Sequence, residues 1–379
     1  MAKDRKTKNL KQKIKGTNIY LKAVTPIRIR RLVKAPSMFP EYERKSAVNR
    51  YVDNYKWFLR YGRHNPYYNL TGLDVKGLRD QKDYVDIRYI RKDRKKQHHQ
   101  DSARAQHRDE NLTQKYSLLA DDKYMFYSYI EGLNPKYVPK THLVIQGNHL
   151  IKPFEIDEKQ SARDGLASLP DGKYIAKASI GAFGDSIRVL EKKDGEIIVS
   201  KGEITLEEFL IETAEEPYII QDFIKQHDAI NKIYPDAVST LRIISTRWNE
   251  ETHILASMLR MGINGNVVDN ASDGGTFVGV DIDKGCLMEY GYYYDRPRET
   301  CHPDTGLVYK DYPIPYWDEA VKLVKRLHPV IFGLSTIGWD IAITETGPVI
   351  VEINWNYSVK GIQIASGGLR KRWDELKEK

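Results

Sequence analysis

The chain contains the stretch GWDIAIT at residues 338–344, a short turn ETG at 345–347, and PVIVEINWN at 348–356. Two apolar segments joined by a short turn with a glycine predict a β-hairpin. Each predicted strand nevertheless carries side-chain oxygens, from Asp340 on the first and from Glu352 and Asn354 on the second. Because side chains alternate along a strand, Glu352 and Asn354 point to the same face. We predict that these three side chains form an oxygen cage for a metal ion such as Mg²⁺.

The alternative is a surface hairpin whose polar face is simply hydrated. The hairpin alone does not decide between these two interpretations. A phosphate-binding site elsewhere in the chain would favour the metal, since Mg²⁺ usually combines one or two carboxylates with water and substrate phosphate.

The bulk properties are those of a globular protein that is too long for a single core. A length of 379 residues predicts two or three subdomains. Hydrophobic residues make up 41% of the chain, but no apolar run is long enough to cross a bilayer, and the N-terminus is too charged for a signal peptide. A cytoplasmic location is therefore the expectation. The only two cysteines, Cys286 and Cys301, lack the spacing of a metal site and are expected to be reduced.

The charge is unevenly distributed along the chain. Residues 1–110 hold 29 Lys and Arg against 12 Asp and Glu, a net charge of +17, whereas the remainder carries −9. We expect a flexible basic arm at 1–15 and a basic, mainly helical domain at 16–115, with a helix over Tyr51–Tyr61 and a solvated polar run over Arg88–Glu110. His98, His99 and His107 fall in that run and are expected to be solvated rather than bound to metal.

Three uses of this basic region are open. It is a solvated surface, or it attaches the protein peripherally to an anionic membrane or a phospholipid-linked sugar at the inner face of the membrane. A nucleic-acid-binding role is the third and ranks low, because no RNA-binding signature is present and the aromatic residues are explained equally well by helix packing.

The rest of the chain divides into three segments. Residues 116–170 are expected to be a linker and a segment that precedes the two subdomains, with an amphipathic helix at Leu118–Ile130. Residues 171–228 are expected to form a first α+β subdomain, and residues 229–379 a second one that ends in the hairpin. The first subdomain is predicted to contain strands at 174–177, 187–190, 197–199 and 218–224, with a helix opened by the capping box of Thr205 and Glu208. The second is predicted to contain strands at 240–246 and 254–261, a long loop through Gly274 and Gly275, and a helix at 317–328.

Lys177 ends a predicted strand and precedes a small, glycine-containing loop. Such a loop folds its N–H groups and hydroxyls over phosphate oxygens, and the lysine adds positive charge. The candidate phosphate ligands are Lys177, Ser179, Gly181, Gly184, Asp185 and Ser186. An ordinary hairpin with an exposed lysine is the alternative.

The apolar strand that begins at Tyr218 turns abruptly polar. Its end is a candidate adenine site, formed by Gln221, Asp222, Phe223 and Ile224, with Asp228 placed for the ribose hydroxyls. The alternative is a buried strand leaving the core. Arg242 is more telling, because a lone guanidinium in an apolar strand is costly unless it meets an anion.

These features, in this order, resemble the ATP-grasp superfamily from about Leu118 to Gly368. Asp122 and Lys123 resemble the Asp-Lys pair that opens a helix in the D-alanyl-D-alanine ligase branch, where the lysine contacts ATP phosphate. The resemblance implies an α+β fold of two subdomains clasping ATP, with Lys123 and Lys177 on the phosphates, Mg²⁺ held by Asp340, Glu352 and Asn354, and Arg242 and Lys177 as the catalytic groups.

A narrower resemblance is to the sugar-transfer-associated ATP-grasp branch, which is linked with bacterial surface-polysaccharide synthesis. It is carried by Asp121-Asp122-Lys123, by Ser239-Thr240-Leu241-Arg242 and by Gly274-Gly275. The chain departs from many relatives at Gln221-Asp222, where they have Glu, and after Asn354, where ligases often have a Pro-Gly turn.

The resemblance implies a ligase that joins a carboxylate to an amine through an acylphosphate, releasing ADP, with small-molecule substrates among which sugar-linked ones are candidates. A kinase that phosphorylates a small molecule or sugar and stops there is the closest alternative. Residues Asn270, Ser272, Asp273, Gly274 and Gly275 are an acceptor site or a plain loop. Neither the substrates nor the oligomeric state follows from the sequence.

Overall fold

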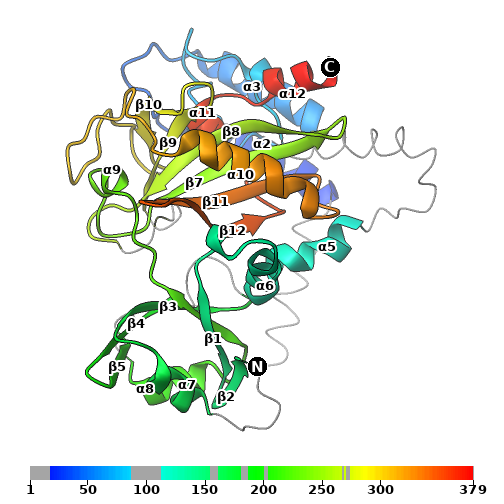
Figure 1. Ribbon diagram of the computed structural model, residues 1–379. Coiled ribbons are helices and arrows are strands. Elements are labelled where there is room, and N and C mark those ends of the chain that lie inside the picture. The colour runs from blue at the N-terminus through cyan, green and yellow to red at the C-terminus, as the bar shows by residue number, and fades with distance from the viewer. Residues whose placement is uncertain are drawn as a thin grey trace, which may run out of the picture.

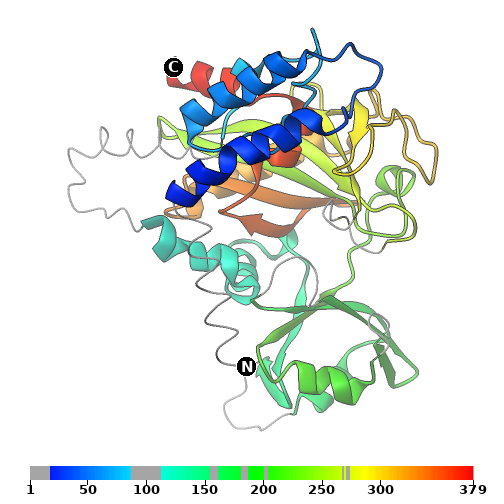
Figure 2. The ribbon, with the colours of Figure 1, turned by 180° about the vertical axis from the view of Figure 1, so that it is seen from behind.

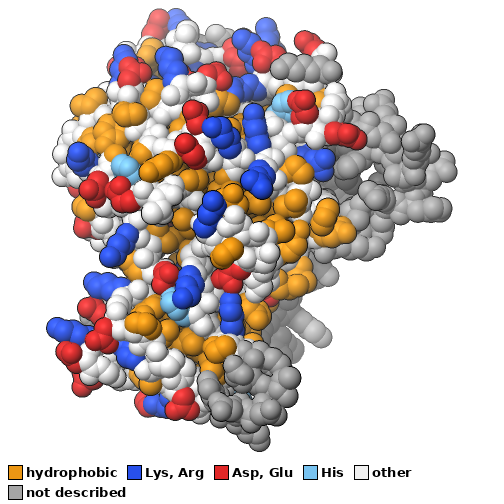
Figure 3. All heavy atoms as spheres, viewed as in Figure 1, with side chains coloured by type: hydrophobic (Ala, Val, Ile, Leu, Met, Phe, Trp, Pro, Cys, Tyr) orange, Lys and Arg blue, Asp and Glu red, His pale blue; other side chains and the backbone are white. Residues whose placement is uncertain are grey.

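The computed structural model describes residues 18–86, 112–153, 161–180, 187–199, 204–266, 269 and 274–378. This part of the chain forms two lobes, each built on a six-stranded antiparallel sheet (Figure 1). The outline of the molecule narrows where the two lobes meet (Figure 3). The arm predicted at residues 1–15, the polar run at 88–110 and the three histidines within it lie outside the described residues.

The smaller lobe, lower in Figure 1, holds the sheet of order β2-β1-β6-β3-β4-β5. Its strands are β1 (Thr141–Gln146), β2 (His149–Lys152), β3 (Gly172–Ala178), β4 (Ile187–Lys193), β5 (Glu196–Val199) and β6 (Tyr218–Asp222). Helices α7 (Ala162–Ser168) and α8 (Leu206–Glu212) contribute Leu166 and Phe209 to its core. Thr205 and Glu208 form the predicted capping box of α8.

The smaller lobe begins earlier in the chain than the sequence predicts. Residues 116–170 are predicted to be a linker, but β1, β2 and α7 come from this segment, and β1 pairs with β6 in the middle of the sheet. Strand β1 is short, and its buried residues are Thr141 and the continuous run Leu143, Val144 and Ile145, so its sequence shows no clear alternation of apolar and polar residues.

The larger lobe holds the sheet of order β10-β9-β8-β7-β11-β12. Its strands are β7 (Thr240–Trp248), β8 (Glu251–Met261), β9 (Thr276–Asp281), β10 (Cys286–Tyr292), β11 (Thr336–Thr344) and β12 (Gly347–Asn354). Helix α10 (Trp317–Leu327) buries Trp317, Val324 and Leu327 against one face, as its helical spacing predicts. Helix α11 (Val359–Ser366) packs on β8, β9 and β10 and shares a second core with α12 (Arg370–Glu378).

Two strands of this sheet, β9 and β10, fall where the sequence predicts only a loop. Five of the six residues of β9 are buried, so the strand shows no alternation of apolar and polar residues. Gly279 allows α11 to lie close to β9, since a β-carbon on Gly279 would lie 2.8 Å from the carbonyl oxygen of Ala365 on that helix. A glycine in a strand interior is therefore a packing requirement here rather than a loop signal.

The helix predicted over Leu118–Ile130 is two helices, α5 (Leu112–Asp121) and α6 (Lys123–Leu133). They are separated by Asp122, whose backbone is extended and whose carboxylate accepts a hydrogen bond from the Met125 N–H at 3.0 Å. An N-cap aspartate satisfies a free N–H of the first helical turn, so Asp122 begins α6 instead of continuing α5. Helix α6 lies between the two lobes (Figure 1).

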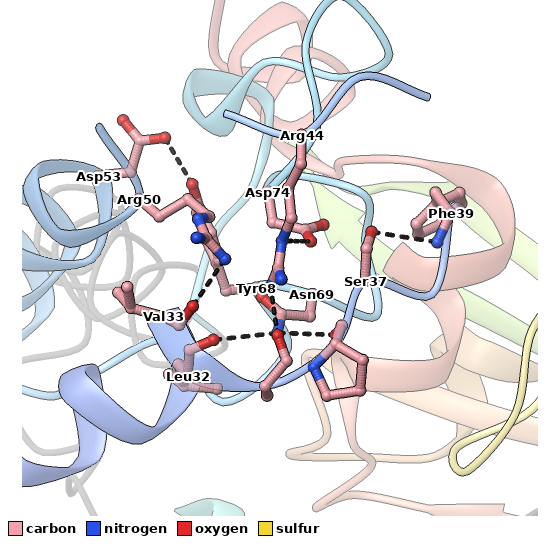
Figure 4. Close-up of polar contacts among 12 residues, drawn as sticks. Leu32, Val33, Ser37, Phe39, Arg44, Arg50, Asp53, Tyr68, Asn69 and Asp74 are labelled. Carbon is pink, nitrogen blue, oxygen red and sulfur yellow. Dashed lines mark hydrogen bonds and ion pairs between the residues drawn. The ribbon is translucent and has the colours of Figure 1, made fainter. Parts of the chain in front are cut away.

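The N-terminal segment forms α2 (Asn18–Lys34) and α3 (Ala47–Tyr61), which lie over the larger lobe (Figure 2). Side chains from later in the segment cap the C-terminal end of α2 (Figure 4). Arg50 donates to the Val33 carbonyl at 2.6 Å and Asn69 to the Leu32 carbonyl at 3.1 Å. These contacts satisfy carbonyl groups that the helix itself leaves open.

The same segment shares its core with the larger lobe. Val85 and the Gln363 side chain exchange two hydrogen bonds, at 3.0 and 2.8 Å, and Phe39 and Val75 are buried in the core of α11 and α12. Beyond α2 and α3 the described part of 18–86 is mostly turns and extended chain. A separate, mainly helical N-terminal domain is therefore not confirmed. None of the helices described has the length and apolar character needed to span a bilayer.

Candidate active site

The predicted metal ligands meet on one face of the larger sheet. In the register of the strands, Asp340 on β11 stands opposite Glu352 on β12 and opposite Arg242 on β7. Arg242 in turn stands opposite Met258 on β8. Directly opposed residues share a face, so Glu352, Asp340 and Arg242 form a row of charged side chains that crosses three strands, with Met258 next to it on the fourth.

Asp340 is the centre of a buried ion-pair network. It is 2% exposed, and the Arg242 guanidinium binds both of its oxygens, with Nη2 at 2.8 Å from Oδ2. Arg260 Nη2 lies 3.0 Å from Oδ2, and Asn354 Nδ2 donates to the same oxygen at 3.3 Å. Burial works to raise the pKa of Asp340, but the two guanidinium groups outweigh it and hold the pKa below its ordinary value. Asp340 is therefore an ionised carboxylate.

Arg260 is a site residue that the sequence analysis does not include. It also lies 3.5 Å from Asp269, and it donates to the Thr240 hydroxyl at 2.6 Å. The argument that identifies Arg242 applies equally to Arg260, because it is a second lone guanidinium in an apolar strand. Burial raises the pKa of Asp269, against the opposing effects of Arg260 and Thr240.

The pKa of Glu352 is shifted in the opposite direction from that of its neighbour Asp340. Burial and the Asp340 charge raise its pKa, while Lys123, Arg242 and Arg260 oppose the rise. Within the described residues no ion pair holds its carboxylate. A partly buried carboxylate without a fixed counter-ion is open to bind a cation.

The residues present fit Mg²⁺. The described residues contain no group of three or more His, Cys, Asp and Glu side chains that could hold a metal ion. Asp340, Glu352 and Asn354 instead offer two carboxylates and an amide oxygen, the hard donors that suit Mg²⁺. Asp340 shares its oxygens with two arginines, so Glu352 and the Asn354 oxygen are the more available donors.

Lys177, from the smaller lobe, is buried next to this face. Its Nζ lies 3.4 Å from the Tyr127 hydroxyl and 5.6 Å from the centre of that ring. Burial lowers the pKa of Lys177 to about 8; Glu352 raises it and Lys123 lowers it further. These effects on the pKa of Lys177 indicate that Lys123, Lys177 and Glu352 lie near one another. Tyr127, which the sequence analysis does not single out, donates its hydroxyl hydrogen to the Val351 carbonyl and so joins α6 to β12.

Ser179 connects the end of β3 to the start of α6. Its hydroxyl donates to Asp122 Oδ1 at 2.6 Å, and its carbonyl accepts from the Lys123 N–H at 2.8 Å. Ser179 is 2% exposed. These contacts position Lys123 and Lys177 relative to one another.

The predicted adenine residues divide into two groups. The Gln221 side chain is fully buried in the smaller lobe, where it donates to Thr141 at 3.1 Å, and Asp222 contacts His142 at 2.6 Å. Phe223 and Ile224 follow the end of β6, outside its ladder, and Phe223 is 39% exposed. The structure thus leaves the main chain at 223–224, rather than the Gln221 side chain, open to a ligand.

The chain then crosses to the larger lobe. The His227 N–H donates to the Ile343 carbonyl at 2.8 Å, and the exposed Asp228 begins the short helix α9 (Asp228–Asn231). Its N–H donates to Glu345 at 2.7 Å. Gly181, Gly184, Asp185 and Ser186, like Asn270, Ser272 and Asp273, lie outside the described residues.

A family model described as sugar-transfer associated ATP-grasp matches residues 102–378. The chain belongs to the sugar-transfer associated ATP-grasp family. The predicted family and the ATP-grasp fold are confirmed, with ATP as the nucleotide that defines these proteins. No curated protein matches the chain.

Several solved ATP-grasp ligases are distantly similar to this member of the family. The ligase PsnB, in complex with a phosphomimetic variant of its minimal precursor, Mg and ADP, has 12% identity and a TM-score of 0.37, covering 69% of this chain and 61% of its own. D-alanine-D-alanine ligase from Helicobacter pylori has 11% identity and a TM-score of 0.36, with the same coverage. D-alanyl-alanine synthetase A from Vibrio cholerae has 12% identity and a TM-score of 0.38, covering 68% and 61%. The chain thus spans about 61% of the length of these proteins.

Proposed function

We propose that this protein is an ATP-dependent, ADP-forming ligase that joins a carboxylate to an amine through an acylphosphate. The observation that carries the proposal is the meeting of Lys177 from one lobe with the row of Glu352, Asp340 and Arg242 from the other. Opposed lobes that bring lysines to a carboxylate and amide face are what an ATP–Mg²⁺ site between them requires.

Each group has a role that follows from its position. Lys123 and Lys177 neutralise phosphate oxygens on the side of the smaller lobe. The main chain at 223–224 holds the adenine, Phe223 supplies an apolar surface, and Asp228 binds ribose hydroxyls. Asp340, Glu352 and Asn354 hold Mg²⁺, which supplies charge neutralisation at the terminal phosphates when it is bound.

Arg242 lies beside Asp340 and is placed to stabilise charge on the transferred phosphoryl group. In the first step a carboxylate oxygen of the substrate bonds to the γ-phosphorus and the bond to the ADP oxygen breaks. In the second step the amine nitrogen attacks the acyl carbon, phosphate leaves, and the amine loses a proton. No side-chain nucleophile is needed, so positioning and charge dominate catalysis.

The decisive experiment follows ADP release from MgATP across carboxylic acids, with and without amines. Release that requires both substrates and yields an amide supports the ligase. A stable phosphorylated product formed without an amine would instead support the kinase. The absence of nucleotide binding would remove both.

Substrates linked to sugars and a role in surface-polysaccharide or related sugar-conjugate synthesis form the finer part of the proposal. The family description supports it, since it names an association with sugar transfer. We place this activity in the cytoplasm. Including sugar-acid nucleotides among the carboxylic acids tests the substrate class directly.

We also propose peripheral attachment to an anionic membrane through α3. Apolar side chains at helical spacing are exposed on this helix: Val48 (71%), Tyr51 (41%), Val52 (40%), Tyr55 (47%) and Leu59 (66%). Beside them is an open hollow of about 540 Å³ whose lining includes Arg30, Lys34, Arg44 and Arg50, of which Arg44 is paired with Asp74 and Arg50 donates to the Val33 carbonyl. An apolar stripe flanked by cations suits an anionic lipid surface.

Sedimentation with vesicles tests this attachment. The protein should sediment with phosphatidylglycerol-containing vesicles and not with phosphatidylcholine alone, and Leu59→Ser should weaken binding. Ile211→Ser, which removes an equally exposed apolar side chain from α8, is the matched control. Equal behaviour of both variants, or indifference to lipid charge, would exclude α3 as the attachment site.

A further inference from the structure

Lys360 is a partly buried cation that is surrounded by aromatic rings. Its Nζ lies 3.7 Å from the centre of the Tyr294 ring and 5.7 Å from that of Tyr67. Burial lowers the pKa of Lys360. In the described part of the chain no acidic side chain forms an ion pair with it. A partly desolvated ammonium without a counter-ion is costly, and aromatic faces compensate only part of that cost.

The position of Lys360 in its helix adds to this positive potential. It is the second residue of α11, and the first turn of this helix contains no acidic residue. The N-terminal end of a helix carries partial positive charge, which favours an acid there and disfavours a lysine. The Ser358 hydroxyl accepts from the Lys360 N–H at 3.2 Å, and the other N–H groups of the first turn add positive potential to the charge of the lysine. An anion would be stabilised by both.

This point lies on the same face of the sheet as the candidate active site. A β-carbon on Gly361 would lie 3.0 Å from the Tyr294 hydroxyl and 3.2 Å from Met258 Cε. Met258 stands opposite Arg242 on the neighbouring strand, and both Arg242 and Arg260 lower the pKa of Tyr294 against the dominant effect of burial. The row of charges thus runs from Glu352 through Asp340 and Arg242 towards Lys360.

The two ends of this row differ in what they can bind. Lys177 and Lys123 lie near Glu352, at the β12 end, where ATP phosphates are proposed to bind. Lys360 instead contacts Tyr294, whose pKa is lowered by Arg242 and Arg260 against the larger effect of burial. A group held by Lys360 therefore belongs to the carboxylic acid substrate, here called the acceptor, and is distinct from the carboxylate that meets the γ-phosphate.

We propose that Lys360, between Tyr67 and Tyr294, binds a carboxylate or phosphate group of the acceptor substrate other than its reacting carboxylate. The acceptor is then at least a dianion. This inference rests on the proposed function for the identity of the ligand as the acceptor. It also assigns a role to the N-terminal segment, which contributes Tyr67 to the substrate site.

Site-resolved amine labelling tests the anion site without requiring turnover. The full chain is treated with dilute acetic anhydride, with and without saturating MgADP, and the rate at each lysine is read by peptide mass spectrometry. Inorganic phosphate and acetate are the probes. Slower labelling of Lys360, with no change at the exposed Lys322 on α10, supports the site, and the more protective probe identifies the anion. Unchanged labelling of Lys360 with both probes would overturn it.

Calorimetric titration of the effective probe into variants separates charge from structure. Lys360→Met should weaken binding about tenfold, the loss of one charged hydrogen bond, whereas Lys360→Arg should retain most of it. Lys322→Met is the matched control and should bind as the parent protein does. Equal affinity in Lys360→Met and in the parent protein would also overturn the site.

Binding of MgADP distinguishes a failure of the proposed anion site at Lys360 from a failure of the proposed function. MgADP affinity should be the same in Lys360→Met and in the parent protein, because Lys360 is remote from the proposed phosphate lysines. Failure of MgADP to bind any variant would contradict the proposed function, while protection of Lys360 by phosphate without nucleotide would still establish the anion site.

Discussion

The Asp340 network and the surroundings of Lys177 are two neighbouring regions that treat buried charge in opposite ways. Asp340 has two guanidinium partners and a lowered pKa, so its charge is fully compensated inside the larger lobe. Lys177 has a tyrosine hydroxyl and ring, and its pKa is also lowered, which for a cation means that its charge is poorly compensated. The compensated charge of Asp340 stabilises the scaffold in addition to its proposed contact with the metal, whereas uncompensated charge at the junction of the lobes is available mainly to a ligand.

The largest expected effect is loss of turnover on replacing Glu352, the carboxylate without an arginine partner. Glu352→Gln should lower kcat for ADP release about a thousandfold, because a neutral amide neutralises less of the charge on a metal–phosphate centre. Thermal unfolding should show an intact fold. Turnover near that of the parent protein would show that Glu352 is outside the metal site.

Asp340→Asn should differ from Glu352→Gln in stability. It leaves Arg242 and Arg260 facing a neutral amide, and breaking such a buried pair costs about 3 kcal/mol of unfolding free energy. Activity should also be lost, but with a destabilised fold. Urea titration of both variants measures the difference.

The carboxylates of Asp340 and Glu352 should also affect the pH dependence of stability in opposite directions. The folded-state pKa of Asp340 is lowered, so its contribution is present above the unfolded pKa and is lost as the pH falls through the folded value. The folded-state pKa of Glu352 is raised, so its ionisation works against folding at neutral pH. Glu352→Gln should therefore be neutral or slightly stabilising at pH 7, and equal destabilisation by both variants would contradict the distinction.

How far the sequence predicts this site depends on whether a residue breaks a local pattern. Asp340, Glu352 and Arg242 are polar residues in apolar strands, and their approach follows from the hairpin and from strand pairing. Tyr127 and Tyr294 are aromatic residues in regions where aromatic packing is expected, so nothing local marks them.

The elements of the fold also divide into those with a strong local sequence signal and those without one. The hairpin, α10 and the capping box of α8 have strong local signals and are predicted correctly. Strands β1 and β9 are set by neighbours distant in the sequence, since β1 pairs with β6 and β9 is buried under α11. Asp122 shows how one side chain overrides a periodic pattern, because its cap ends one helix and begins another.

Replacing Lys177 tests ligand binding separately from the stability of the fold. Lys177→Met should weaken MgATP binding about tenfold to a hundredfold, because one charged contact to phosphate is lost. The fold should be retained or slightly stabilised, since a poorly compensated buried charge is removed. Calorimetry with MgATP and thermal unfolding measure the two effects separately, and a large loss of stability would place Lys177 in the scaffold instead.

The smallest expected effect is the alkaline decline of ATP affinity in the unmodified protein. Lys177 has a pKa of about 8 without nucleotide. Only its protonated form carries the charge that binds phosphate, so MgATP affinity should fall as the pH rises through about 8, by at most about tenfold per pH unit. Lys177→Arg keeps its charge at these pH values and should lose this decline, even if its affinity at pH 7 is lower. An identical decline in both proteins would assign the titration to another group, and the contrast between a compensated Asp340 and an uncompensated Lys177 would then lose its functional meaning.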